Sequence, residues 1–143
     1  MDFQTTIGEI MTKELISVFL DDKVDDFKEH FERRDIHHIL VEDRGRALMG
    51  IISTEDMKRA YRFMNVVPTL TARHIMTDHP TTLRDDMLLI DAVILFLENK
   101  FRALPVLNED RKLVGIVTTF DLMQEMLKGY KLEKELEDEE DFV

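Results

Sequence analysis

Hydrophobic positions along this chain alternate between runs of strand length and stripes with helical spacing. The run Leu15–Phe19 is apolar and partly β-branched, which predicts a strand. The next apolar residues fall at i, i+3 and i+7, namely Val24, Phe27 and Phe31. This spacing predicts a one-sided helix that begins after Asp21 or Asp22 as its N-cap and ends at about Arg34.

The same pattern of apolar runs and turn residues continues along the rest of the chain. Thr5 or Thr6 is placed to cap a short opening turn that ends at Met11. After the first helix, the pattern predicts two strands around a charged turn and then a helix: His38–Glu42, Ala47–Ile52 and about Thr54–Met64. The second half predicts a strand, a helix, two strands and a last helix: Thr81–Leu83, Asp86–Asn99, Ala103–Leu107, Leu113–Thr118 and Phe120 to about Tyr130. Residues 65–71, which include Pro68, form the candidate linker.

The two halves of the chain are an ungapped repeat with an offset of 65 positions. The matching segments are Ile10-Met11-Thr12 with Ile75-Met76-Thr77, and Leu48-x-Gly50-Ile51 with Leu113-x-Gly115-Ile116. Each repeat reads β-α-β-β-α, at residues 6–66 and 70–128, before an acidic tail at 131–143. Three strands with two helices on one face leave the other sheet face uncovered. We therefore predict an α+β fold in which the two repeats face each other about a pseudo-twofold axis, with a cleft on that axis.

Composition narrows the class of protein. The chain has 143 residues and is 44% hydrophobic, which suits one compact module with a shared core. It has no cysteine, which excludes disulfides and thiolate metal sites. The longest apolar run, Met87–Leu97, is shorter than the ~20 residues needed to span a bilayer. With no secretory signal at the N-terminus, we expect a soluble, cytoplasmic protein.

The charge of the chain is strongly negative and unevenly spread. The net charge is −11, which argues against nucleic acid or an anionic membrane as a partner, because both require a cationic surface. Residues 131–143 carry two lysines and seven acidic residues. Such a block is typical of a solvated helix end, and a partner-binding segment is the alternative.

The segment 87–97 is apolar almost all round, unlike the first helix of the first repeat. A helix with that composition has to be covered on two sides. One side faces its own sheet, and the other faces the sister repeat or a second molecule. We therefore expect a homodimer, formed through helix 87–97 or through the second helices of the repeats.

Each repeat ends in the string Gly-apolar-apolar-Ser/Thr-x-x-Asp. It runs from Gly50 through Ser53 to Asp56, and from Gly115 through Thr118 to Asp121. A strand ends and a helix begins at the hydroxyl residue, where unpaired N–H groups favour an anion such as phosphate. The carboxylate one turn later can accept two hydrogen bonds from a vicinal diol such as that of ribose. The alternative is a capping box, in which the hydroxyl and the acid satisfy only the helix end.

These strings, the Ile-Met-Thr openings and the segment 102–106 (Arg-Ala-Leu-Pro-Val) resemble the CBS domain, named for cystathionine β-synthase. The resemblance covers residues 6–128, and a tandem pair of this kind is called a Bateman module. It implies two intertwined repeats, frequent dimerisation, and adenosine-containing ligands such as AMP, ADP, ATP or S-adenosylmethionine in the clefts. No catalytic cofactor is implied.

The resemblance also implies roles for individual residues. Asp56 and Asp121 would hold ribose, and the hydroxyls of Ser53 and Thr118 would lie near phosphate. Other phosphate contacts and the adenine contacts would come from positions before the second strands and in the first strands: His37, His38 and Arg102 for phosphate, Ile16 and Thr81 for adenine. The family often has basic residues before the second strand, so Ala103 departs from the pattern, and Leu40 replaces the proline seen at 105.

The adjacent histidines have several possible roles. Neighbouring strand residues point to opposite faces, so we expect only one of His37 and His38 to enter a cleft. A phosphate contact by one of them competes with a plain structural role. The same geometry makes metal binding by the pair unfavourable, and no further ligand cluster is visible. Arg102 is the better anion donor because it is always charged.

Three functions follow from these observations. A regulatory module would bind an adenosine-type ligand, change shape and act on a separate, unknown partner protein. A ligand-free scaffold would use both strings only as helix caps. An enzyme is disfavoured, because no Gly-rich phosphate loop, Ser/Cys–His arrangement or metalloprotease motif is present. Titration with adenosine ligands separates the first two functions.

Overall fold

The computed structural model describes residues 4–32, 36–67 and 69–140. The first repeat contains α1 (Ile7–Ile10), β1 (Ser17–Phe19), α2 (Val24–Phe27), α3 (Glu29–Glu32), β2 (His38–Glu42), β3 (Leu48–Ser53) and α4 (Thr54–Tyr61). The second contains α5 (Ala72–Ile75), β4 (Thr77–Asp78), β5 (Leu83–Arg84), α6 (Leu89–Asn99), β6 (Ala103–Leu107), β7 (Leu113–Thr118) and α7 (Thr119–Glu140). These elements confirm the predicted α+β fold of two β-α-β-β-α repeats.

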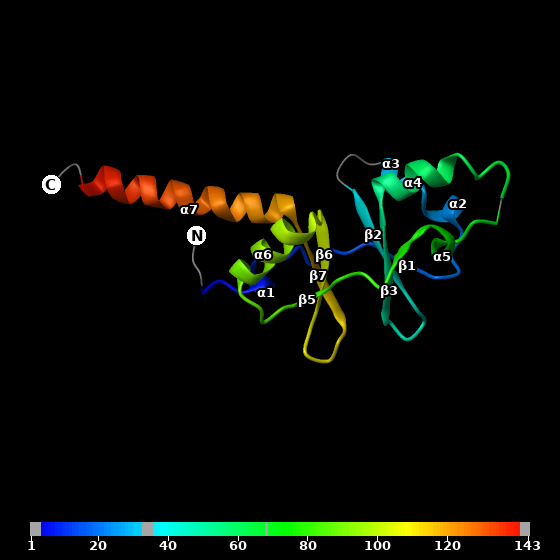
Figure 1. Ribbon diagram of the computed structural model, residues 1–143, viewed down its shortest axis with the longest axis horizontal. Coiled ribbons are helices and arrows are strands. Elements are labelled where there is room, and N and C mark those ends of the chain that lie inside the picture. The colour runs from blue at the N-terminus through cyan, green and yellow to red at the C-terminus, as the bar shows by residue number, and fades with distance from the viewer. Residues whose placement is uncertain (1–3, 33–35, 68, 141–143) are drawn as a thin grey trace.

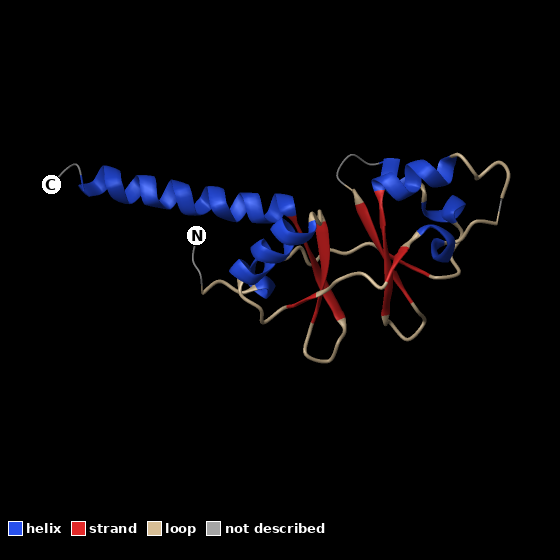
Figure 2. Ribbon diagram, viewed as in Figure 1, coloured by secondary structure: helices blue, strands red, loops and turns tan. Residues whose placement is uncertain are grey.

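Two small sheets lie next to each other at the centre of the molecule, with helices on their outer sides (Figure 1, Figure 2). In each sheet the first strand pairs in parallel with the second, and the second and third form an antiparallel hairpin. The helices α2, α4 and α5 flank the β1–β4 sheet, and α1 and α6 flank the β5–β7 sheet (Figure 1). The inner sides of the two sheets therefore face the middle of the molecule.

The repeats exchange their opening segments. The strand β4 comes from the second repeat but pairs with β3 of the first, where Thr77 lies opposite Ile51. In return, Thr12 of the first repeat pairs with Ile116 of the second through two backbone hydrogen bonds of 2.9 and 3.0 Å. Each repeat therefore completes the sheet of the other.

The short helices take part in the same exchange. The N–H of Ile7 in α1 donates to the carbonyl of Met87 at 2.8 Å, and its side chain is fully buried among residues of the second repeat. The counterpart of Ile7 in α5 is Ala72, whose N–H donates to the carbonyl of Asp22 at 2.9 Å. Because α1 packs on the second repeat and α5 packs on the first, a change in the relative position of the repeats would alter the packing of both cores.

A glycine in each third strand allows the exchanged segment to approach closely. A Cβ at Gly50 would lie 2.8 Å from the carbonyl oxygen of Thr77, and one at Gly115 would lie 3.1 Å from that of Thr12. Both distances are shorter than ordinary van der Waals contact, so a side chain at either position would push the crossing strand away. The repeated Gly in the two strings is thus explained by the packing of the exchange.

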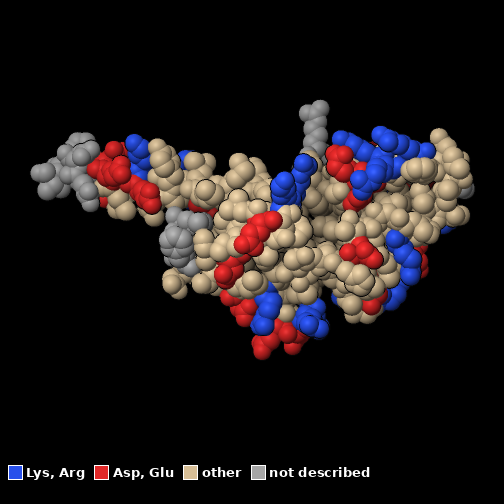
Figure 3. Space-filling view, in the orientation of Figure 1, with Lys and Arg blue, Asp and Glu red and all other residues tan. Residues whose placement is uncertain are grey.

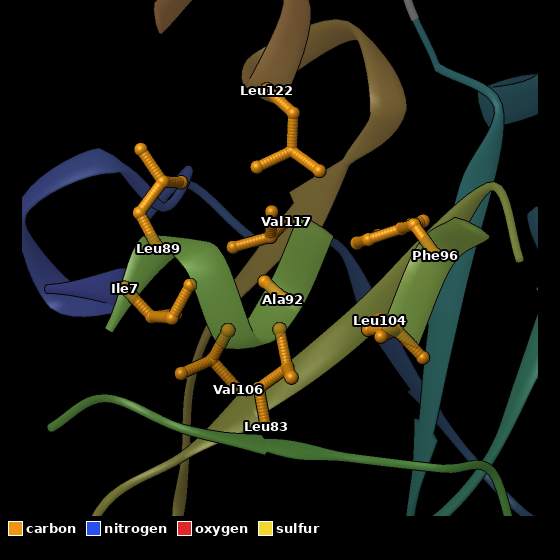
Figure 4. Packing of buried hydrophobic residues seen from close by; sticks show 9 residues of the cluster. All are labelled: Ile7, Leu83, Leu89, Ala92, Phe96, Leu104, Val106, Val117 and Leu122. Atoms are coloured by element: carbon orange, nitrogen blue, oxygen red, sulfur yellow. The ribbon is translucent and has the colours of Figure 1, made fainter. Parts of the chain in front are cut away.

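Each repeat has its own hydrophobic core, built on the inner face of its outer helices. The second core contains nine buried residues, shown in Figure 4: Ile7, Leu83, Leu89, Ala92, Phe96, Leu104, Val106, Val117 and Leu122. The first core has the equivalent composition and includes Ala72 from α5. Ile94 and Leu97 of α6 remain 46% and 77% exposed, so the apolar helix is only partly covered within the chain.

Several predicted element boundaries were wrong. The N-cap of α2 is Lys23, whereas the Asp22 carboxylate accepts the N–H of Phe19 at 2.8 Å and so closes the preceding turn. A turn at Lys28, closed by the Phe31 N–H at 3.1 Å, divides the predicted first helix into α2 and α3. The predicted end of that helix at Arg34, and Pro68 of the linker, lie outside the described residues.

The second repeat and the strands differ from prediction in a similar way. The helix α6 begins at Leu89 instead of Asp86, because Arg84–Met87 form a turn in which Asp86 is ion-paired with Arg84 at 3.0 Å. The strands β1 and β5 are shorter than predicted, since their parallel pairing covers only three and two residues. The helix α4 ends at Tyr61 because the next residues form turns.

The last helix extends well beyond its predicted end. α7 continues from Thr119 to Glu140 and projects from the body of the molecule (Figure 1). Acidic side chains gather at its far end, and Lys and Arg side chains gather over α4 (Figure 3). Residues 131–139 of the acidic tail are therefore helical and exposed. No helix in the described residues combines the length and the apolar composition required to cross a membrane.

Candidate functional site

A cleft of about 1430 Å³ lies between the two repeats. It is lined from both sides by the ends of the third strands and the starts of the helices that follow, including Ser53, Asp56, Thr118 and Asp121. Pockets that hold one drug-sized ligand usually have volumes of ~300–1,000 Å³. This central cleft therefore has room for more than one small ligand, and both Ser/Thr-x-x-Asp strings open onto it.

In the first string, the Asp56 carboxylate has partners on both oxygens. The backbone N–H and the hydroxyl of Ser53 donate to Asp56 Oδ2 at 2.8 and 2.9 Å, and the Asp56 N–H donates to Ser53 Oγ at 3.2 Å. Asp56 Oδ1 is paired with the guanidinium of Arg59, one turn further along α4. Asp56 is only 6% exposed, so its carboxylate is nearly closed to solvent.

The second string repeats the cap but not the ion pair. The Thr118 N–H donates to Asp121 Oδ2 at 2.9 Å, and the Asp121 N–H donates to Thr118 Oγ1 at 3.1 Å. The counterpart of Arg59 is Gln124, and no cation of the described residues pairs with Asp121. Asp121 is half-buried. The cap itself therefore uses one carboxylate oxygen, Oδ2, and Asp121 Oδ1 has no hydrogen-bond partner among the described residues.

Both strings are capping boxes, as one of the two predicted interpretations required. An ionised carboxylate has two oxygens and about four acceptor positions. A cap that occupies only Oδ2 is compatible with a ligand contact at Oδ1. The capping role therefore does not exclude the binding role.

The histidines lie differently from the prediction. Both His37 and His38 line the cleft, because His37 precedes the first residue of β2 and is not bound by strand alternation. Burial lowers the pKa of His38, and the neighbouring His37 and Arg102 act in the same direction, against the opposing effect of Asp56. His38 is therefore mainly neutral at pH 7 and presents a hydrogen-bonding group to the cleft, not a cation.

Most of the other predicted positions also line the cleft. Arg102 and Ile16 do, from the segment before β6 and the segment before β1. Thr81 is exposed and is not among the lining residues. Sequence reasoning missed Lys100, which lines the cleft, and the pairing of Arg59 with Asp56. The described residues contain no cluster of three or more His, Asp or Glu that could hold a metal ion.

Acidification is expected to destabilise the fold through His38. Its folded-state pKa lies below the ordinary value of 6.5, so below about pH 6.5 the unfolded chain binds the proton more readily. Stability contributed by His38 is then lost as the pH falls, while above that range His38 is neutral in both states. We expect His38→Gln to reduce the loss of stability between about pH 7 and about pH 5, measured by urea unfolding.

A matched control for this experiment is His79→Asn, because the side chain of His79 is 93% exposed and Asn tolerates its positive φ. The control should keep the pH dependence of the parent protein. If His38→Gln and the parent show the same slope of stability against pH, His38 does not titrate differently in the folded state.

The two-repeat architecture and the sequence agree with one known family. The family model of the CBS domain matches this sequence twice, at residues 7–62 and at residues 72–128. The chain belongs to the CBS domain family. The predicted resemblance is thus confirmed, and the chain is a tandem CBS pair.

Solved CBS pairs share the fold of this chain. The CBS-pair protein CBSX2 from Arabidopsis thaliana, in a complex with AMP, is 31% identical, with a TM-score of 0.74 over 86% of this chain and 96% of that chain. The cytosolic domain of the Mg²⁺ channel MgtE, in a complex with ATP, is 27% identical, with a TM-score of 0.71 over 83% of this chain and 48% of that chain. Adenine nucleotides therefore bind to both of these relatives.

Several curated relatives are much longer than this CBS pair. The uncharacterized protein MJ1404 of Methanocaldococcus jannaschii is 30% identical over 125 residues, which are 86% of this chain and 28% of that protein. The chain spans 20 to 36% of the length of three such relatives. What these proteins share with the chain is the CBS pair.

Proposed function

We propose that this CBS pair is a regulatory module that binds adenosine-containing nucleotides in the central cleft and transmits the change to a partner protein. The observation that carries the proposal is that both Ser/Thr-x-x-Asp strings open onto one cleft built by both repeats. The complexes of CBSX2 with AMP and of the cytosolic domain of MgtE with ATP support it, because this chain shares the fold of CBSX2 and of part of that domain.

The chemistry of the cleft suits a nucleoside phosphate. Oδ1 of Asp121, which takes no part in the cap, would accept hydrogen bonds from the two hydroxyls of a ribose, as a carboxylate does for a vicinal diol. The starts of α4 and α7 line the cleft, and their partial positive charge would favour phosphate oxygens together with the Thr118 hydroxyl and Arg102. Adenine would lie near the backbone around Ile16, whereas Thr81, the counterpart of Ile16 in the other repeat, lies outside the lining of the cleft.

The exchanged segments explain how a bound ligand would act at a distance. A ligand that contacts both repeats favours one relative position of the two sheets over others. Because Thr12 and Thr77 each belong to one repeat and pair with the other, a shift of one sheet moves the opening segment of its sister. The outer helices then move with their sheets and present the change to a partner.

We infer a binding role and not a catalytic one. The residues that converge on the cleft supply hydrogen-bond acceptors, helix N-termini and cations. These groups hold a nucleotide without a nucleophile and base in the arrangement that acyl or phosphoryl transfer requires. The activities of longer relatives then belong to other parts of those proteins.

The proposal predicts a large stabilisation by adenosine ligands. Thermal unfolding and isothermal titration calorimetry would be carried out with AMP, ADP, ATP and S-adenosylmethionine. A ligand at 100 times its Kd should raise the free energy of unfolding by about 2.7 kcal/mol. The double variant Asp56→Asn with Asp121→Asn should lose this stabilisation, because neither position then offers a carboxylate that accepts hydrogen bonds from both ribose hydroxyls. A protein that none of these ligands stabilises would be a scaffold whose strings only cap helices.

We also propose that the chain forms a homodimer through its second helices. Exposed apolar side chains follow one face of α7 at i, i+3, i+7 and i+10: Phe120, Met123, Leu127 and Tyr130. They are between 53% and 65% exposed. The helix α6, by contrast, has two exposed large apolar side chains in its described residues, Ile94 and Leu97. We call the four residues on α7 the α7 stripe and expect a second copy to cover it.

A further inference from the structure

The two ends of the cleft differ in how much of each carboxylate is free for a ligand. We call Ser53, Asp56 and His37 the first half-site, and their counterparts Thr118, Asp121 and Arg102 the second half-site. Of the about four acceptor positions on a carboxylate, three are filled on Asp56, by Ser53 N–H, Ser53 Oγ–H and Arg59. Among the described residues, only the Thr118 N–H fills a position on Asp121.

This difference matters for a ribose, because its two neighbouring hydroxyls need two acceptor positions. Asp121 retains three open positions, including both on Oδ1. Asp56 retains one, and its single remaining position shares Oδ1 with Arg59. A ribose can therefore bind Asp56 through both hydroxyls only after Arg59 leaves.

The hydroxyl groups of the two half-sites differ in the same direction. The Ser53 hydroxyl donates its proton to Asp56 at 2.9 Å. The Thr118 hydroxyl accepts the Asp121 N–H at 3.1 Å, and within the described residues its proton has no acceptor. Thr118 can therefore donate to a phosphate oxygen without giving up an existing hydrogen bond, and Ser53 cannot.

The positions before the second strands add to the difference. His37 in the first half-site corresponds to Arg102 in the second, 65 residues later, and both line the cleft. Lys100 lies two residues before Arg102 and lines the cleft as well. Arginine holds its charge at any physiological pH and binds phosphate with two N–H groups.

We propose that the second half-site binds nucleotide more tightly than the first, and that Arg59 sets this difference by holding the carboxylate that a ribose in the first half-site requires. The assignment rests on the proposed binding of adenosine nucleotides in the cleft. Arg59 is not among the residues that line the cleft, and its side chain is 67% exposed. It therefore acts as an internal competitor for Asp56 and not as a phosphate donor.

Single-site variants separate the half-sites. The variant Asp56→Asn changes the first half-site and leaves the second intact. The variant Asp121→Asn changes the second half-site and leaves the first intact. In calorimetric titrations with AMP, we expect Asp56→Asn to bind about tenfold more tightly than Asp121→Asn, since a hydrogen bond to a charged group is worth about that factor. Circular dichroism and thermal unfolding show whether each variant is folded.

The duplication supplies reciprocal exchanges that leave both caps unchanged. Arg59→Gln gives the first half-site the residue found in the second, and Gln124→Arg does the reverse. In the Asp121→Asn background, Arg59→Gln should tighten the binding of adenosine by up to about fivefold, the usual range for an exposed ion pair. In the Asp56→Asn background, Gln124→Arg should weaken adenosine binding by a similar factor. Adenosine is the probe because it has ribose but no phosphate.

Lys58→Gln is the control for a change of charge on α4, because Lys58 is exposed and paired with Glu55, not with Asp56. It should leave adenosine binding unchanged. Equal affinities of the two single-site variants for AMP would overturn the assignment. An Arg59→Gln variant with weaker AMP binding and unchanged adenosine binding would overturn it as well. A parent protein that binds no adenosine compound would overturn the proposed function itself, and the assignment with it.

Discussion

Ile7→Ala is expected to destabilise the fold by about 2–5 kcal/mol, the range measured for truncation of a fully buried isoleucine. Ile7 has no exposed surface, and its side chain packs against α6 and the strands of the second repeat (Figure 4). Its backbone N–H also donates to Met87 at 2.8 Å, so the local chain has little freedom to collapse into the space. Urea unfolding followed by circular dichroism measures the loss.

The interest of Ile7 lies in its place in the chain. It belongs to the first repeat in sequence, but its side chain belongs to the core of the second. If each repeat folded only with its own opening segment, Ile7→Ala would lower the stability of the first repeat instead. Leu97→Ala is the control, because Leu97 is 77% exposed and the same kind of truncation there should change stability by less than about 0.5 kcal/mol.

The strands with turn residues on both sides could be predicted from the sequence alone. The predicted bounds of β2, β6 and β7 match the structure, since each is an apolar, β-branched run next to a charged turn. The start of α6 could not be predicted in the same way. The apolar pattern continues through Met87 and Leu88 into the preceding turn, so hydrophobicity alone gives no boundary there.

The exchange of opening segments is a property of long-range packing. Ile7 and Ala72 occupy equal positions in the two repeats, and the local pattern is the same whether each segment stays with its own repeat or crosses to the other. Family resemblance implied intertwined repeats, but the residues themselves did not. Gly50 and Gly115 were visible as repeated positions, and their close contacts with the crossing strands explain them only once the structure is known.

Part of the candidate site could be predicted from the sequence because its residues recur in both repeats. Two copies of one string brought Ser53, Asp56 and their counterparts to attention, and all of them line one cleft. Arg59 was missed because pairs of opposite charge three residues apart are common on helices, as Lys58 with Glu55 shows. The useful signal was the mismatch of Arg59 with Gln124 between two otherwise similar repeats.

Substituting the α7 stripe is expected to abolish self-association of the chain. The double variant Met123→Asp with Leu127→Asp places two charges on side chains that are 65% and 53% exposed in the single chain. Burying two large apolar side chains contributes about 3 kcal/mol or more, so the dimer Kd should rise by about 100-fold or more. Neither residue lines the cleft, so nucleotide binding should change little. Sedimentation velocity over a range of concentrations measures the association.

The matched control is the double variant Ile94→Asp with Leu97→Asp on α6, the other surface expected to mediate dimerisation. These side chains are 46% and 77% exposed, so both variants add charge to similar apolar surface. A dimer that survives the α7 change and is broken by the α6 change would place the interface on α6. The α7 stripe is the stronger expectation because its four residues form one continuous face, whereas α6 exposes two. A parent chain that sediments as a monomer would instead leave the α7 stripe to a different protein, such as the partner on which the module acts.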